Sequence, residues 1–209
     1  VWETPDIVEW NFDRSIPADK PVSMASYVSI ATDEDLRNSH RDYSGFIRDH
    51  YLQLPYDLPE RIKLLTDEIT SGSNNTFDKS VAVEKYLRTS GFIYSQDIDP
   101  PPPGSDGVEH FLFVSGSGYS DYFASAMAVM LRTQGIPARL AAGYSGGLYD
   151  PKTDKSTVLD SDSHGWVQVY FPDYGWIDFE PTPEWTRPAR EIRKNNPSNF
   201  IRSLGNLYT

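Results

Sequence analysis

Apolar residues fill the segment 120–134 so completely that the pattern predicts a helix enclosed by the rest of the protein. A helix on the surface keeps one broad polar face, and this segment has hardly any. Its apolar positions include Phe123, Ala124, Ala126, Met127, Val129, Met130 and Leu131. Gly135 is a natural C-terminal stop and Pro137 prevents continuation of the helix.

Two further helices are predicted ahead of this central one. In the first, Pro59 fits the first turn, and Ile62, Leu65 and Ile69 fall at i, i+3 and i+7 on one face. The second is expected to start with Asp78 as its cap and to run to about residue 90, where Gly91 breaks it. Its apolar side carries Val83, Tyr86 and Leu87.

Strand patterns follow the central helix. Residues 138–144 read as a strand, 145–163 as a polar loop, and 164–171 and 174–180 as two strands joined around Pro172 and Asp173. Helices first and antiparallel strands afterwards indicate an α+β fold, with a buried central helix packed on an antiparallel sheet.

The pattern divides the chain into three parts. Residues 1–45 read as an extended, β-rich extension, with weak strand alternation at 26–31. Residues 46–185 form the main domain, in which Pro100 to Pro103 force an extended connector. Residues 186–209 form a basic tail, which is either a solvated tail or the approach to a membrane.

Composition narrows the functional classes. A net charge of −11 argues against a nucleic-acid partner, because such binding requires basic surface. The longest apolar run, 124–131, is far too short to cross a bilayer. The absence of cysteine excludes disulfides and thiolate metal sites. No pair among the four histidines has the spacing of metal ligands, so neither a metal nor another cofactor is expected.

Four aspartates in the 145–163 loop, Asp150, Asp154, Asp160 and Asp162, leave calcium binding open as an alternative. They lack the fixed spacing of a known calcium loop, which favours a solvated turn.

Ser120 and His164 are the candidate catalytic pair. Ser120 stands at the start of the buried helix, where the dipole and free N–H groups favour an anion. Taken alone it is read as a helix cap, because serine is among the best N-cap residues. His164 opens a strand, and on its own it fits a surface histidine beside a surface acid.

Strand parity indicates which acid can reach His164. If the hairpin folds about Pro172, His164 lies opposite Glu180; a fold about Asp173 shifts the pairing by two residues and keeps the same face. Asp178 is the alternative acid on that face.

Three motifs together resemble the bacterial transglutaminase-like family, which has a papain-like cysteine-transferase fold. They are Gly118-Tyr119-Ser120-Asp121-Tyr122-Phe123-Ala124, His164-Gly165-Trp166-Val167-Gln168-Val169-Tyr170, and Gly175-Trp176-Ile177-Asp178-Phe179-Glu180-Pro181-Thr182-Pro183. The likeness covers roughly residues 50–185. It departs from the family pattern in Ser120 for Cys, Gly165 for the common Ala, and Gln168 for the common Glu.

The resemblance implies a catalytic triad of Ser120 at the nucleophile position, His164 as base and Glu180 as acid. It implies acyl transfer or amide hydrolysis on a peptide or protein glutamine, with an amine or water as acceptor. Because a serine hydroxyl is a much weaker acid than a thiol, this form is expected to be inactive or nearly so. Ser120 fits both a natural loss of the thiol and a near-isosteric replacement of a cysteine.

Two rival functions stay open. One rival is a natural pseudoenzyme that binds peptide or cell-wall material without catalysis. The other is a serine hydrolase that uses Ser120, His164 and Glu180. The resemblance further implies an extracytoplasmic domain of a bacterial membrane protein, and this domain is expected to be monomeric.

Overall fold

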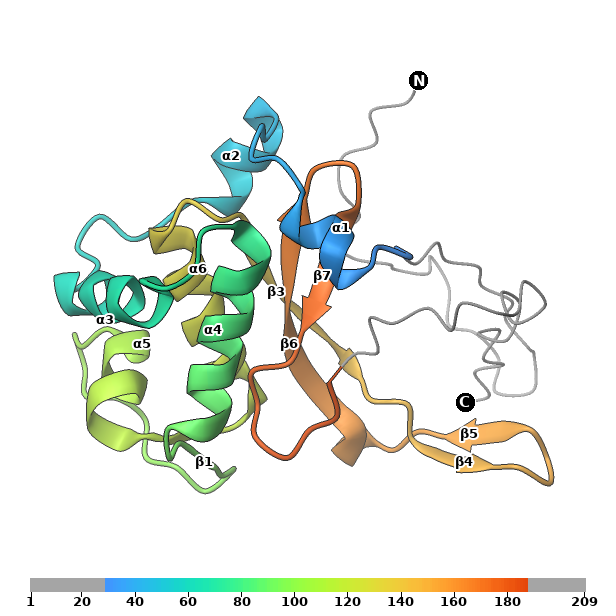
Figure 1. The fold of residues 1–209 in the computed structure, drawn as a ribbon. Coiled ribbons are helices and arrows are strands. Elements are labelled where there is room, and N and C mark those ends of the chain that lie inside the picture. Colours follow the sequence, from blue (N-terminus) through green and yellow to red (C-terminus); the bar gives the residue numbers. More distant parts are fainter. Residues whose placement is uncertain (1–28, 188–209) are drawn as a thin grey trace.

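A layer of helices and a small antiparallel sheet meet along helix α6 (Ser120–Thr133), which lies between them (Figure 1). The computed structural model describes residues 29–187. The α+β prediction, with a buried central helix packed on an antiparallel sheet, is confirmed.

Helix α6 forms as its pattern predicts. It begins at Ser120 and ends at Thr133, one residue before the expected end, and Gly135 adopts a left-handed φ of 66°. Fully buried side chains line it on several faces: Phe123, Ala124, Ala126, Met127, Met130 and Leu131. The helix is therefore the centre of the hydrophobic core.

The sheet has the strand order β3–β6–β7, with both pairs antiparallel. Its strands are β3 (Ala138–Tyr144), β6 (Ser163–Phe171) and β7 (Gly175–Phe179). Val167, Val169 and Phe171 of β6 are fully buried, and α6 packs against β6 and β3. Val167 lies opposite Phe179, so the β6–β7 hairpin folds about Asp173, which takes a φ of 72°.

Two helices that pack on each other cover the other side of α6: α3 (Glu60–Thr70) and α4 (Thr76–Thr89). Pro59 is the N-cap residue of α3 rather than a member of its first turn. The expectation that Asp78 caps α4 is wrong. Asn75 is the cap, and its side chain accepts a 2.8 Å hydrogen bond from the backbone N–H of Asp78.

Several short elements were not anticipated. They are α1 (Asp33–Arg37), α2 (Gly45–Tyr51), β1 (Ile93–Tyr94), α5 (Gly107–His110), the π-helical turn η1 (Phe111–Ser115) and β2 (Ser117–Gly118). Helix α1 packs on α4 and adds the buried Leu36 to the core. Strands β1 and β2 pair in parallel and deliver the chain to the start of α6.

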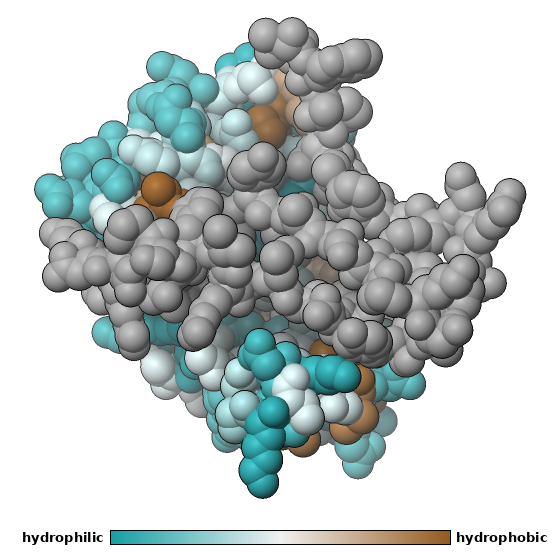
Figure 2. Space-filling view, turned by 90° about the vertical axis from the view of Figure 1, so that its right-hand side faces the viewer, coloured by the Kyte–Doolittle hydropathy of each residue, from teal (hydrophilic) through white to brown (hydrophobic). Residues whose placement is uncertain are grey.

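The polar segment 145–163 is more regular than a loop. It contains a hairpin of β4 (Leu148–Asp150) and β5 (Lys155–Thr157), followed by the 3₁₀ turn η2 (Asp160–Asp162). The hairpin projects from the body of the domain (Figure 1). The described surface on this side is mostly hydrophilic, with small, separate hydrophobic patches (Figure 2).

Some expectations fall outside the described residues. These are half of the possible strand at 26–31 and nearly all of the basic tail, 186–209; residues 29–31, the described half, form no strand. The domain boundaries at 45/46 and 185/186 stay a prediction. Within residues 29–187, no helix combines the length and apolar character that a membrane crossing requires.

Candidate active site

Ser120 is the first residue of α6, and its side chain points to the sheet rather than capping the helix. Tyr119 holds the cap position, without a side-chain hydrogen bond. Ser120 is 6% exposed, and its Oγ accepts a 3.0 Å hydrogen bond from the backbone N–H of Gly165 on β6. The hydroxyl therefore lies where helix and sheet meet, beside the histidine that precedes Gly165.

A tight packing contact explains the glycine two residues before Ser120. A β-carbon added to Gly118 would lie 2.6 Å from Cβ of Tyr122, which is closer than two non-bonded carbon atoms approach. Glycine is therefore the residue that lets the chain turn closely into α6. The first N–H groups of α6, at Ser120 and Asp121, have no acceptor within the helix, so they favour negative charge next to Ser120.

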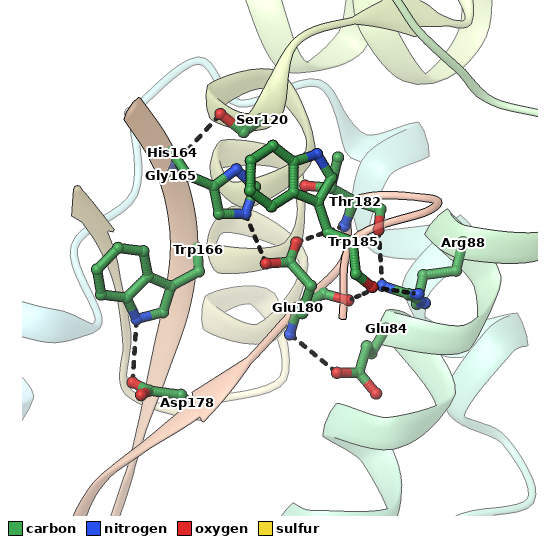
Figure 3. Close-up of polar contacts among 10 residues, drawn as sticks. All are labelled: Glu84, Arg88, Ser120, His164, Gly165, Trp166, Asp178, Glu180, Thr182 and Trp185. Carbon is green, nitrogen blue, oxygen red and sulfur yellow. Dashed lines mark hydrogen bonds and ion pairs between the residues drawn. The ribbon is translucent and has the colours of Figure 1, made fainter. Parts of the chain in front are cut away.

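His164 is buried and bonded to an acid. Its Nε2 lies 2.6 Å from Oε2 of Glu180, and both side chains are 5% exposed. This hydrogen bond favours the tautomer with the proton on Nε2. Nδ1 has no hydrogen-bond partner and lies on the side of the ring that faces Ser120 (Figure 3). The structure thus brings Ser120, His164 and Glu180 together, with no hydrogen bond formed between Ser120 and His164.

Glu180 follows directly after β7 and has both carboxylate oxygens engaged. Oε1 accepts a 2.9 Å hydrogen bond from the backbone N–H of Thr182, while Oε2 faces His164. Asp178 lies elsewhere. Its Oδ1 accepts hydrogen bonds from Nε1 of Trp166 at 3.0 Å and from Nε2 of Gln168 at 2.8 Å. Between the two candidate acids, it is Glu180 that contacts the imidazole.

Trp185 covers one face of the imidazole. The two ring centroids are 3.6 Å apart and the ring planes differ by 10°, so the rings are stacked (Figure 3). The indole limits the access of water to the His164–Glu180 pair. Water exclusion strengthens a polar contact, because the effective dielectric falls.

Two clefts open near Ser120, and each is lined by its neighbours rather than by Ser120 itself. One of about 640 Å³ opens beside His164 and is lined in part by Tyr144, Trp166 and Trp185. The other, of about 420 Å³, lies against Tyr119 and Asp121, the neighbours of Ser120 in the chain.

The loop aspartates make turn contacts. Within residues 29–187, no group of three His, Cys, Asp or Glu side chains is placed to hold a metal ion. Asp150 accepts hydrogen bonds from the backbone N–H of Lys152 and the hydroxyl of Thr153, and these bonds lower the pKa of its carboxyl. Asp162 accepts from the backbone N–H of Leu159.

Over residues 63–181 the chain matches the transglutaminase-like superfamily. It belongs to that superfamily. The resemblance read from the three motifs is therefore confirmed.

Similar proteins are bacterial. The chain is 42% identical over 160 residues to YebA, an uncharacterised protein of Bacillus subtilis, and 37% identical over 131 residues to a protein-glutamine gamma-glutamyltransferase of Pseudomonas aeruginosa. These matches cover 74% and 63% of the chain, and only 21% and 19% of the two relatives. The chain thus corresponds to about a fifth of either protein.

A solved structure supports the transglutaminase-like fold. The periplasmic domain of TgpA from Pseudomonas aeruginosa superposes with a TM-score of 0.58 at 35% identity. The match covers 68% of this chain and 48% of that one.

The motif residues of this transglutaminase-like domain were found from the sequence, and several of their supports were not. Trp185, Glu84 and Arg88 went unnoticed. The only signal was the i, i+4 spacing of Glu84 and Arg88 within a predicted helix, which is common to many surface ion pairs.

Proposed function

We propose that this domain is an acyl-transfer unit acting on glutamine side chains of peptides or proteins. Position 120 is the nucleophile position, His164 the base and Glu180 the acid that orients it. The observation that carries the proposal is the imidazole geometry: Nε2 is held at 2.6 Å by Glu180, and the unpartnered Nδ1 faces Ser120. An orienting acid on one nitrogen leaves the other to exchange a proton with the nucleophile.

With a cysteine at position 120, the reaction would run in two steps. The thiolate attacks the carboxamide carbon, and backbone N–H groups at the start of α6 stabilise the oxyanion. Protonated His164 gives its proton to the leaving nitrogen, so ammonia departs and a thioester remains. An amine or water then attacks the thioester and loses a proton to His164, so the product departs and the thiolate beside protonated His164 is restored.

With serine at position 120, we propose little or no turnover. The helix start and the imidazole can stabilise a thiolate, but a serine hydroxyl is far too weak an acid to ionise in the same field. The serine form therefore retains the scaffold and lacks the reactive anion.

The relatives support the choice of substrate and location. One is named a protein-glutamine gamma-glutamyltransferase, and the solved neighbour is a periplasmic domain. By extension, we propose that this chain is a monomeric, extracytoplasmic part of a bacterial membrane protein. Its donor is a glutamine in a peptide or protein, and its acceptor is an amine or water.

Restoring the thiol tests this function. Ser120→Cys should release ammonia from glutamine peptides or incorporate a labelled amine into them, and adding His164→Ala should abolish both. His40→Ala is the matched control, because His40 also contacts a carboxylate, at 3.2 Å from Asp173, but at the exposed surface. Equal losses in the two histidine variants would contradict a catalytic His164.

A pseudoenzyme is the second candidate, and Ser120 itself favours it. In that case Ser120→Cys stays inactive while the clefts still bind peptide, which titration calorimetry would detect. A third outcome separates the serine hydrolase. Robust amide hydrolysis by the serine form, lost on Ser120→Ala, would replace both proposals.

A further inference from the structure

Two charged side chains of α4, Glu84 and Arg88, lie behind the triad and take no part in the reaction described above. They are four residues apart, so they project from the same face of the helix. The side chain of Glu84 is only 1% exposed, and Arg88 is half-buried. Because burying a charge is costly, such groups need specific partners.

Arg88 binds three backbone carbonyls beyond the end of β7. Its Nη1 donates to the carbonyls of Glu180 at 2.8 Å and Thr182 at 2.6 Å, and its Nη2 donates to that of Trp185 at 2.9 Å. Strand β7 ends at Phe179, so these carbonyls lie past the sheet hydrogen bonds. The guanidinium supplies the hydrogen-bond donors that a neighbouring strand would otherwise offer to these carbonyls (Figure 3).

Glu84 binds the same segment through the backbone N–H of Glu180, whereas Arg88 binds its carbonyl. Its Oε1 accepts a 2.9 Å hydrogen bond from the backbone N–H of Glu180, and its Oε2 lies 3.3 Å from Nε of Arg187. Both backbone groups of Glu180, the N–H and the carbonyl, are therefore fixed by α4. That leaves the side chain of Glu180 little freedom to move away from His164.

The segment held in this way carries both groups that contact the imidazole. Glu180 bonds its edge and Trp185 stacks on its face. A shift of the segment would move both contacts together. Catalytic geometry is sensitive to such shifts, since a displacement of about 1 Å can cost about 100-fold in rate.

We propose that Glu84 and Arg88 are positioning residues that set the orientation of His164 through the backbone of residues 180–185. The claim that the two residues orient the His164 ring rests on the geometry alone. The claim that this orientation supports catalysis also rests on the proposed function. The two parts are tested separately.

The structural part is tested in the serine protein by NMR of the His164 ring. Stacking on Trp185 shifts the ring protons, and the bond to Glu180 fixes the nitrogen shifts of the Nε2–H tautomer. Arg88→Lys should change both sets of signals, because an ammonium cannot span three carbonyls as the guanidinium fork does. Lys85→Gln, an exposed change on the same helix, should leave them as they are. Unchanged His164 signals in Arg88→Lys would overturn the proposal.

The catalytic part is tested by amine incorporation in the Ser120→Cys background. Arg88→Lys and Glu84→Ala should lower kcat by about 100-fold while KM stays close to that of the parent. Glu84→Gln should restore most of kcat, because its amide oxygen can still accept the N–H of Glu180. A loss that only follows the folded fraction measured by circular dichroism, or one shared by Lys85→Gln, would overturn the positioning role.

The two failures are distinguishable. If the Ser120→Cys parent is inactive while the His164 signals respond to Arg88→Lys, the proposed function falls and the positioning stands. If Glu84→Ala does not fold, Arg88→Lys and Glu84→Gln still decide, because both keep a charged or polar group at the buried position.

Discussion

The thiol introduced by Ser120→Cys should ionise more readily than a free cysteine, and its pKa is the sharpest test of the site. The chain contains no cysteine of its own, so this thiol would be the only one to label. An unperturbed cysteine has a pKa of about 8.5. In the structure, three features act on the atom at this position: the start of α6, the N–H of Gly165 and the imidazole of His164.

A lower limit for the stabilisation of the thiolate follows from the helix start and the Gly165 hydrogen bond alone. A charge at a helix terminus gains at least about 0.3 kcal/mol, and a hydrogen bond to a charged group at least about 1.5 kcal/mol. Together these give about 1.8 kcal/mol, and at about 1.4 kcal/mol per pKa unit they lower the pKa by more than one unit. Burial opposes ionisation, while a protonated His164 favours it. We expect a thiol pKa at or below about 7.

The assay is the rate of alkylation by iodoacetamide as a function of pH. His164→Ala in the same background should move the midpoint upward, because the cation that favours thiolate is lost. His40→Ala should leave the midpoint in place. A midpoint near about 8.5 in the parent would refute an activating site at the start of α6.

Three further predictions concern the acid, the core and a helix cap. In the Ser120→Cys background, Asp178→Asn should leave the alkylation midpoint close to that of the parent, whereas Glu180→Gln should shift it, because of these two acids it is Glu180 that contacts the imidazole. The reverse order would assign the acid to Asp178. Phe123→Ala should destabilise the domain by about 3–5 kcal/mol in urea unfolding, since its fully buried ring would leave a cavity. A loss below about 1 kcal/mol would show that the core collapses around the site. Asn75→Ala should cost about 1 kcal/mol by the same measurement, and Asn75→Ser less, because serine also caps a helix and brings no second carboxylate to Asp78, whose Oδ2 lies 2.7 Å from the Asn75 amide nitrogen.

The sequence predicted best what depends on local pattern. The bounds of α6 and β3 follow from their apolar residues and from Gly135 and Pro137, which lie between the end of the helix and the start of the strand. The face shared by His164 and the acids follows from strand parity, which survives an error in the turn. The register of the β6–β7 hairpin could be settled only by the structure. Pro172 and Asp173 are both acceptable turn centres, and the two choices give strand pairings that differ by two residues.

Prediction failed where structure depends on distant contacts or on very short elements. Helices α1 and α2 are five and seven residues long, too short for a clear period. The three strand residues of β4 and of β5 are exposed, so no buried face marks them. The contacts of Arg88 reach residues 92 to 97 positions away, and nothing in a local pattern specifies such partners.

That separation also bears on the order in which the domain assembles. His164 and Glu180 are only 16 residues apart in one hairpin, whereas Arg88 must close a loop of more than 90 residues to reach the same segment. Local contacts form before distant ones, because long loops cost more entropy to close. We therefore expect the β6–β7 hairpin to pair before α4 docks, and the contact between Glu180 and His164 to be fixed only by that docking.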